Sequence, residues 1–409
     1  MNFRDASVLI IGHTVPEPQT TAAGVRMMAL ISFFKSRHAV IHFATAAANS
    51  DYAVDLSQQG IHCHQLILND DHVTSLLDQC RPNIVVFDRF MTEEQYGWRV
   101  RAHSPNTVTI LDTEDLHGLR KARQFAHEHT LPLDVYSDVT KRELASIWRC
   151  DVSLIISKFE YTWLQETFGV PQTLLFYWPL VFDMANQDAH DQEQTQDFIC
   201  IGNLNHAPNL DAMSWLISDI WPKIEAHLPG VKLHIYGAYG RDMQQRKWQK
   251  TKGVLVHGWA PDIVPAMIQA RVNLAPLRFG AGLKGKILQA LQLGLPTVTT
   301  LIGAEGIAQE GTKALLIAEN EIDLVQKAVA LYTDAPMWKA QQDQGKYLIT
   351  NSFSSAYFNA AFVLFLEPIM QDLSIHRQRH FMGQVLQHQS LYASKYLGRW
   401  LTLKAEFGA

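Results

Sequence analysis

The stretch RFGAGLKGKILQALQLG, residues 278–294, matches three different phosphate-binding patterns. Gly280, Gly282 and Gly285 spell the G-x-G-x-x-G of dinucleotide-binding loops, and residues 280–286 spell G-x-x-x-x-G-K, one residue short of a nucleotide-triphosphatase P-loop. The third pattern is a loop that holds the diphosphate of an activated sugar. Each pattern requires different neighbours, so the flanking sequence decides between them.

The flanking residues disfavour the first two patterns. A P-loop needs Ser or Thr after its lysine to bind magnesium, and that position is Ile287. A dinucleotide loop starts directly after a strand and is followed by a strand that ends in an acid. Here residues 276–279 intervene, the next strand ends at Thr299 and Thr300, and Glu305 lies too far along the loop.

A simpler anion site remains. Gly280 and Gly282 allow the backbone to approach an anion closely, and the expected helix at residues 286–293 directs its first amides toward it. A helix terminus contributes only roughly 0.3 to 1 kcal/mol per neighbouring charge, so a diphosphate also requires cationic side chains. Those cations are Arg278, Lys284 and Lys286. A turn with solvated lysines is the alternative.

Composition limits the class of protein. A chain of 409 residues is too long for one ordinary core, which predicts two domains. Lys and Arg total 35 against 40 Asp and Glu, without the basic stripe of a nucleic-acid binder. The four cysteines form no C-x-x-C pair, and in His62-Cys63-His64 the cysteine and the histidines face opposite sides of a strand. We therefore expect no structural metal, disulfide framework or nucleic-acid partner.

Short β-branched runs alternate with helical patterns, which predicts a parallel α/β architecture. The expected strands of the first half are SVLIIG, AVIHFAT, IVVFD, VTILD and VSLIIS, and those of the second half are DFICIGN, VKLHIYG, VLVHGW, VNLAPL, TVTT and ALLIA. The polar stretch near residues 184–196 has no apolar periodicity and is the expected linker. The expected units are residues 1–183, the linker, residues 197–370 and a terminal part at 371–409.

The two ends of the chain give weaker signals. The N-terminus has only a five-residue apolar run and predicts a strand instead of a signal peptide. The longest apolar run, AAFVLFL at residues 360–366, is too short to span a membrane, so we expect a cytoplasmic protein. Helices are expected at residues 353–367 and 375–409. The second has an apolar stripe that favours a buried packing face over a membrane-surface face: Phe381, Val385, Leu386, Tyr392, Tyr396, Trp400 and Leu403.

With its continuation LPTVTTLIGAEGI, the opening stretch resembles the donor-binding core of GT-B-fold glycosyltransferases, specifically the retaining group called family 4. The family pattern is a glycine-rich turn, a lysine, an EAMA-x-G-x-P-V-V unit and a G-x-E-G turn. Here it reads as Gly280-Ala281-Gly282, Lys284, QALQLGLPTV and Gly303-Ala304-Glu305-Gly306. GVRMMALISFF, CDVSLIISKFE and GNLNHAPNLDAMSWL also match in order, so the resemblance covers almost the whole chain.

The resemblance implies two Rossmann-like domains that face each other across a cleft, with the C-terminal helices packed back on the first domain. It also assigns donor-binding roles. Gly282 and Lys284 would meet the diphosphate, Gln289 the ribose, and the loop at Trp259 the base. Other donor-side residues implied are Gly24, which would let its loop close over the phosphates, and Asn203, Asn205, Arg278, Gly280, Lys286 and Glu305.

Two departures from the family pattern bear on activity. Family members often carry two glutamates eight positions apart, and here those positions hold Ala281 and Gln289. Hydrogen bonds to charged groups contribute about 1.5 to 3 kcal/mol against roughly 0.5 to 1.5 for neutral ones, so ribose binding should weaken without vanishing. The Arg and Lys expected after Gly202-Asn203 are also absent.

The segment TILDTEDLHGLRKAR, residues 109–123, places ionisable groups just beyond an expected strand. Relatives use a histidine in this region to contact the transferred sugar, so His117 and Asp112 are the predicted catalytic residues. In the structural alternative, Glu114 and Asp115 cap the next helix and pair with Arg120 or Arg123. A third interpretation, the metal-binding D-x-D of the other major glycosyltransferase fold, leaves the second α/β domain unexplained.

The function implied by the resemblance is transfer of a sugar from a nucleotide-diphosphate donor to an acceptor hydroxyl, with retention, without a metal and without a cofactor beyond the donor itself. The acceptor could be a carbohydrate, a lipid-linked molecule or a protein, in the synthesis of a surface polysaccharide; peripheral membrane contact stays open. Two alternatives remain, a non-catalytic GT-B-like partner subunit and a sugar-nucleotide epimerase of the same fold.

Overall fold

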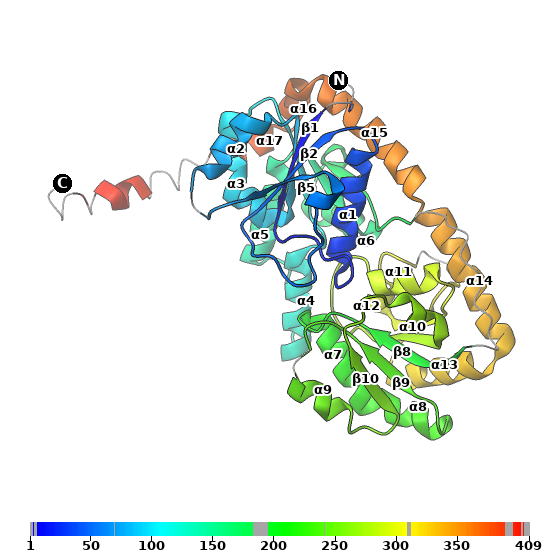
Figure 1. Ribbon diagram of the computed structural model, residues 1–409. Helices are drawn as coiled ribbons and strands as arrows, with labels where there is room; N and C mark the ends of the chain where they lie inside the picture. The colour runs from blue at the N-terminus through cyan, green and yellow to red at the C-terminus, as the bar shows by residue number, and fades with distance from the viewer. Residues whose placement is uncertain are drawn as a thin grey trace.

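Two α/β domains make up the body of the molecule, and Figure 1 shows them one above the other. The computed structural model describes residues 3, 6–68, 70–182, 195–240, 242–308, 312–388, 396–401 and 404. The expected linker at residues 184–196 lies almost entirely outside the described residues. The prediction of two Rossmann-like domains is confirmed by the two separate parallel sheets.

The first domain contains a seven-stranded parallel sheet in the order β3-β2-β1-β4-β5-β6-β7. Its strands read as continuous apolar runs because helices cover both faces; Val8, Leu9 and Ile10 are fully buried. The elements are β1 (Ser7–Gly12), α1 (Ala22–Lys35), β2 (Val40–Thr45), β3 (His62–Gln65), α2 (His72–Cys80), β4 (Ile84–Asp88), α3 (Arg89–His103), β5 (Val108–Asp112), α4 (His117–His129), α5 (Asp138–Arg149), β6 (Val152–Ile155), α6 (Lys158–Phe168) and β7 (Leu175–Tyr177).

The second domain contains a six-stranded parallel sheet in the order β10-β9-β8-β11-β12-β13. All six strands expected from the second half of the sequence are present. The elements are β8 (Gln196–Ile201), α7 (Ala207–Trp215), α8 (Trp221–His227), β9 (Leu233–Tyr236), α9 (Asp242–Trp248), β10 (Val254–Gly258), α10 (Val264–Gln269), β11 (Ala270–Ala275), α11 (Gly285–Gln292), β12 (Thr297–Thr300), α12 (Leu301–Ala304), β13 (Leu316–Ala318), α13 (Glu321–Thr333) and α14 (Ala335–Ser352).

The chain crosses back to the first domain between α14 and α15 (Ser355–Gln371). The two crossings lie side by side, because Phe182 donates its N–H to the Phe353 carbonyl at 2.9 Å and accepts from Ser355 at 3.2 Å. Four apolar residues of α15 are buried in the core of the first domain: Phe358, Phe362, Leu366 and Ile369. The C-terminal helices therefore pack on the first domain as expected, and α15 joins this domain although residues up to 370 were assigned to the second.

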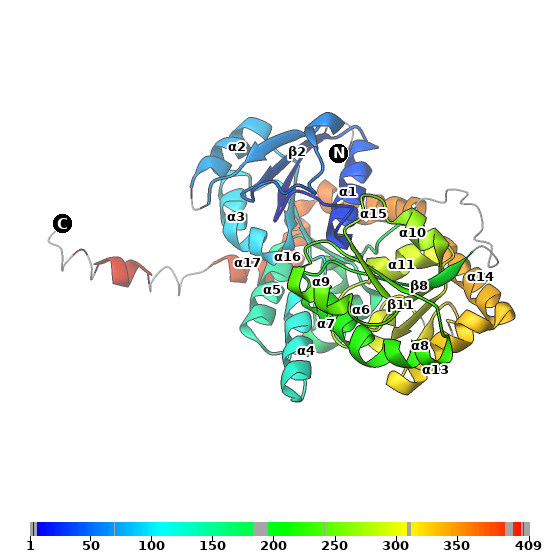
Figure 2. The ribbon, with the colours of Figure 1, turned by 60° about the horizontal axis from the view of Figure 1, so that its bottom comes forward.

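The expected long helix at residues 375–409 is wrong. The structure instead has α16 (Leu373–Arg379) and α17 (Phe381–Gln387), with a further helical stretch at 396–401 that stands clear of both domains in Figure 1 and Figure 2. The expected buried stripe is also wrong, because four of its members are exposed by about half or more: Phe381 63%, Val385 48%, Tyr396 59% and Trp400 55%. Leu386 is half-buried, and Tyr392 and Leu403 lie outside the described residues.

Among the described residues, no single helix is both long and apolar enough to cross a membrane. The pair α15 and α16 meets the requirement of composition and length together, with a bend of 94° between its two helices. The apolar side chains of α15 are explained by packing, because its buried residues fill the core of the first domain.

Candidate donor-binding site

The loop between β11 and α11 adopts a backbone that requires glycine. Gly280 has φ +144° and Gly282 has φ +66°, both in the region that disfavours residues with a Cβ. A Cβ on Gly282 would lie 2.7 Å from the Cβ of Asp115, which belongs to the first domain. The loop at residues 280–286, hereafter the glycine loop, therefore meets the first domain at backbone level.

Lys284 is buried and Lys286 is half-buried, and both ammonium groups donate to neutral oxygen atoms. Lys284 Nζ donates to the Gly282 carbonyl at 2.8 Å, and Lys286 Nζ donates to Asn209 Oδ1 at 2.6 Å. Among the described residues, neither ammonium forms an ion pair. Burial lowers the pKa of each lysine to about 8. For Lys284, the nearby Glu305 and Glu160 carboxylates partly oppose this shift.

The first turns of two helices meet beside these lysines. α11 begins at Gly285, where a Cβ would lie 2.9 Å from the Cβ of Ala22, the first residue of α1. The positive ends of two helix dipoles therefore converge from opposite domains. Gly24 was expected in a mobile closing loop, but it lies inside α1 because Thr21 caps that helix by accepting the Gly24 N–H at 2.9 Å.

Two side chains of the first domain hold the glycine loop in place. Arg123 of α4 donates to the Gly280 carbonyl at 2.8 Å and forms a two-pronged ion pair with Glu305 at 2.7 Å. Glu160 of α6 accepts the N–H of Gly282 at 2.8 Å and that of Leu116 at 3.0 Å. Burial, with the nearby Asp115 carboxylate, raises the pKa of Glu160 to about 7. The Glu160 carboxyl group therefore accepts a hydrogen bond from the Gly282 N–H, which was predicted to meet the diphosphate.

The other predicted donor residues lie nearby but differ in their contacts. Arg278 is turned to Asp211 in a two-pronged ion pair, so its charge is already matched. Asn203 bends back to accept the Asn205 N–H at 2.9 Å, and Asn205 itself is exposed. Gln289 is half-buried on α11. Of the three predicted cationic side chains, only Arg278 forms an ion pair within the described residues, and Lys284 and Lys286 do not.

An aromatic contact between the domains was not found from sequence. The Tyr52 ring lies 5.1 Å from the Tyr239 ring and 4.7 Å from the Trp259 ring, and Tyr239 Oη donates to Glu17 at 2.9 Å. Trp259 is the residue predicted to border the base. The sequence signal for this contact is that Tyr239 and Tyr52 lie in the loops that follow β9 and β2, at the carboxyl ends of parallel strands.

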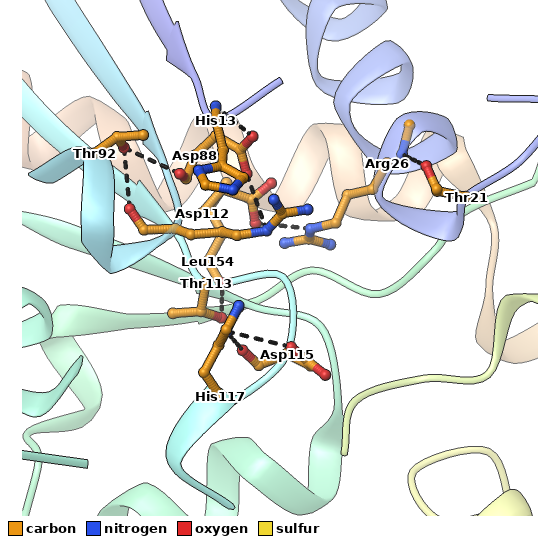
Figure 3. A network of polar contacts seen from close by, with 12 residues as sticks. His13, Thr21, Arg26, Asp88, Thr92, Asp112, Thr113, Asp115, His117 and Leu154 are labelled. Atoms are coloured by element: carbon orange, nitrogen blue, oxygen red, sulfur yellow. Dashed lines mark hydrogen bonds and ion pairs between the residues drawn. The ribbon is translucent and has the colours of Figure 1, made fainter. Parts of the chain in front are cut away.

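At the strand ends of the first domain, Asp112 is fully buried and paired with Arg26. Its Oδ1 accepts from Arg26 Nε at 2.7 Å, as Figure 3 shows, and Arg26 also donates to the Trp178 carbonyl. Burial raises the pKa of Asp112, although Arg26 opposes this shift. Asp112 and Asp88 are register partners on β5 and β4. The predicted catalytic role of Asp112 stays a prediction, and its contacts are those of a structural ion pair.

His117 lies apart from Asp112, on the far side of Thr113 in Figure 3. Its Nδ1 is 3.1 Å from the Asp115 carbonyl, which can only accept, so Nδ1 carries the proton and Nε2 is left as the acceptor. Burial lowers the pKa of His117 to about 4, and the ring is neutral at neutral pH. Its helix is capped by Glu143, which accepts the N–H groups of His117 and Gly118.

The structural alternative for residues 109–123 is borne out in part. Asp115 pairs with Arg120, which brings the pKa of Asp115 down to about 2 although burial opposes the shift. Arg123 pairs instead with Glu305, across the domain interface. Arg89 and Glu114, just after β4 and β5, have φ values of 70° and 61°. Strained non-glycine backbone of this kind concentrates at functional sites.

Comparisons with known proteins agree with this architecture. Residues 195–334 match the family Glycosyl transferases group 1. The fold is similar to sucrose-phosphate synthase from Thermosynechococcus elongatus (TM-score 0.70, 12% identity, 90% of this chain and 99% of that one) and to Anabaena HepE in complex with UDP and glucose (TM-score 0.66, 12% identity, 88% and 99%). It is also similar to a glycosyltransferase from Rickettsia africae (TM-score 0.65, 11% identity, 89% and 98%).

The curated relative found is less informative. It is an uncharacterized 44.6 kDa protein in the cps region of Klebsiella pneumoniae, 24% identical over 182 residues, which are 42% of this chain and 45% of that protein. The protein has the GT-B fold, with two Rossmann-like domains. The part of the chain that matches the glycosyl transferases group 1 family lies in its second domain.

Proposed function

We propose that this protein transfers a sugar from a nucleoside-diphosphate donor to an acceptor hydroxyl. The observation that carries the proposal is the pair of lysines on the glycine loop: Lys284 is buried, Lys286 is half-buried, and neither forms an ion pair in the part of the chain that the structure describes. An uncompensated buried cation is costly to a fold, so its presence indicates an anion that binds there. The family match of residues 195–334 supports a sugar nucleotide as that anion.

The diphosphate would lie where α1 and α11 begin. Both helix N-termini, the Gly282 amide and the two lysines can stabilise negative charge there, including the charge that develops on the leaving diphosphate. Lysine cations supply this stabilisation, so the proposal includes no metal ion. To expose the Gly282 amide, Glu160 would have to release it. The aromatic side chains Tyr239 and Trp259 would border the base.

On the acceptor side, neutral His117 would contact the transferred sugar through Nε2. We propose a hexose or related sugar and retention at the anomeric carbon, as family 4 resemblance implies. The acceptor would be a carbohydrate, lipid-linked or protein hydroxyl. NMR of the product would show the anomeric configuration, and an inverted product would contradict this part of the proposal.

Isothermal titration with a panel of sugar nucleotides tests donor binding. We expect one base to bind and Gly282→Ala to weaken it about tenfold, because the added Cβ would collide with Asp115 and shift the loop. Gly60→Ala is the matched control: its φ of +77° gives the same backbone strain, with no atom within 4 Å of the new Cβ. No binding by any sugar nucleotide would end the enzyme proposal.

One observation favours a second candidate, a non-catalytic partner subunit. Ala281, which replaces a family glutamate, packs against apolar residues of the first domain. Together with the Glu160 carboxylate on the Gly282 amide, this contact could represent a permanently closed interface. Donor binding without turnover, across a panel of acceptors, would favour this candidate; donor turnover without any acceptor would instead indicate an epimerase.

A further inference from the structure

The C-terminal segment has an unusual charge for this chain. Residues 373–405 contain five Lys and Arg and no Asp or Glu: Arg377, Arg379, Lys395, Arg399 and Lys404. The remaining residues contain 30 Lys and Arg against 40 Asp and Glu. Positive charge is therefore concentrated at one end of an otherwise acidic protein.

The start of this segment is fixed to the first domain. Arg377 of α16 binds the Asp151 carboxylate at 2.7 and 2.8 Å and the Thr107 carbonyl at 2.8 Å. On α17, Gln387 donates to the Arg149 carbonyl at 3.1 Å, and a Cβ on Gly383 would collide with the Trp148 carbonyl. The chain therefore leaves the body of the molecule from the first domain, at the end of α17.

Beyond that point large apolar side chains lie exposed. Tyr396, Leu397, Trp400 and Leu401 are 51 to 59% exposed, and Lys404 Nζ lies 5.1 Å from the Trp400 ring centre. Tyr396 and Trp400 lie four residues apart on this helical stretch, as do Leu397 and Leu401, so the four side chains share one face. On α17, Phe381, Met382 and Val385 are also exposed, by 48 to 63%.

We propose that the helical stretch at residues 396–401 of this segment, with Lys404 beside it, docks the first domain on an anionic lipid surface. Tyr and Trp beside Leu form the apolar face of an interfacial helix, and the neighbouring Arg399 and Lys404 attract acidic headgroups. A second copy of the chain fits this segment less well, because it would bring an identical run of positive charge to the same place. The proposal is independent of donor binding by the second domain.

Co-sedimentation of the full chain with vesicles tests the proposal. One vesicle set contains phosphatidylcholine alone, and the other contains phosphatidylcholine and phosphatidylglycerol at about 7 to 3. We expect at least about tenfold stronger partitioning into the anionic vesicles, reduced by added salt. Equal partitioning into both sets, or none into the anionic set, would overturn the proposal.

Two double variants identify the residues responsible. Arg399→Glu with Lys404→Glu should lower partitioning into anionic vesicles at least about tenfold, and Tyr396→Ala with Trp400→Ala should lower it by a similar factor. Matched controls are Lys121→Glu with Lys250→Glu, which changes the net charge equally, and Tyr347→Ala, an exposed tyrosine of the second domain. The controls should stay within about twofold of the wild type.

Light scattering separates the lipid surface from a second copy. If the wild type is a dimer that the Tyr396→Ala and Trp400→Ala variant converts to a monomer, while vesicle binding is unchanged, then the segment pairs with another chain and the proposal fails. Unchanged titration of sugar nucleotides in all variants would show that the body of the protein is intact.

Discussion

The two groups of buried charge in this protein differ in how the charge is matched. At the strand ends of the first domain, the Asp112 carboxylate is paired with Arg26 at 2.7 Å. On the glycine loop of the second domain, Lys284 and Lys286 donate to neutral oxygen atoms, and neither has an ion-pair partner among the residues that the structure describes. A matched pair can serve the fold alone, whereas unmatched buried cations indicate a missing anion. We therefore expect the first group to serve stability and the second to serve the proposed donor binding.

The largest expected effect is on stability, from Asp112→Asn. Because this change leaves Arg26 buried without a counter-charge, the free energy of unfolding should fall by about 3 kcal/mol, measured by urea denaturation. The donor dissociation constant should stay within about twofold. Asp138→Asn removes an exposed pair with Lys141 and should cost under about 1 kcal/mol. If Asp112→Asn abolished donor binding without loss of stability, the assignment of the two groups would be reversed.

Arg123→Ala tests a contact that joins the two domains beside the glycine loop. The variant leaves Glu305, which is only 12% exposed, without its partner, and should lower the free energy of unfolding by about 2 kcal/mol. It should also weaken donor binding, since Arg123 holds the Gly280 carbonyl. Arg142→Ala breaks a similar two-pronged pair with Glu94 at an exposed position and should have little effect on either measurement. If Arg123→Ala and Arg142→Ala lowered stability and donor binding equally, the ion pair between the domains would contribute no more than an exposed one.

Lys284→Met removes an unmatched cation and keeps the apolar stem. The donor dissociation constant should rise at least about tenfold by titration calorimetry. Stability of the free protein should stay constant or increase, because a desolvated charge is lost. An exposed lysine, changed as Lys250→Met, is the control. Loss of stability with unchanged donor binding would make Lys284 a structural residue like Asp112.

The pH dependence of donor binding should follow the lysines. Burial places the pKa of both near 8, and a bound diphosphate favours their charged form, so binding takes up protons. Affinity should therefore fall as the pH rises, by roughly fourfold for each lysine and so by more than about tenfold in total between about pH 7 and about pH 8.5. The fall should be smaller in Lys284→Met, which retains one titrating lysine. A flat profile in the wild type would remove both lysines from the site.

Glu160→Gln should give the smallest effect, and in the opposite direction. Its amide oxygen can still accept the N–H groups of Gly282 and Leu116, while the negative charge near the diphosphate is lost. At about pH 8 donor binding should tighten about threefold, and below the pKa of about 7 the difference should vanish because the wild-type carboxyl is protonated. Glu166→Gln, exposed on the same helix, is the control. Weaker binding would show that the charge of Glu160 assists the donor.

Much of the fold could be predicted from sequence because parallel sheets covered on both faces require continuous apolar strands. All six strands of the second domain were found in this way. The short strand LFY at β7 was missed, since three residues give no usable pattern. The long terminal helix was predicted wrongly because helical spacing continues through residues 375–404, while α16 and α17 are oriented by contacts with the first domain, such as Arg377 with Asp151.

By itself, the sequence determined the two-domain α/β architecture, the glycine loop and the lysines that it carries, because strand periodicity, left-handed glycines and charge are local properties. Tertiary structure alone decided which charges are matched. Arg278 turns to Asp211, Arg123 reaches Glu305 in the other domain, and Glu160 takes the Gly282 amide. These partners lie 67 to 182 positions apart in the chain, so only tertiary packing brings them within hydrogen-bonding distance, inside the second domain for Arg278 and between the domains for Arg123 and Glu160.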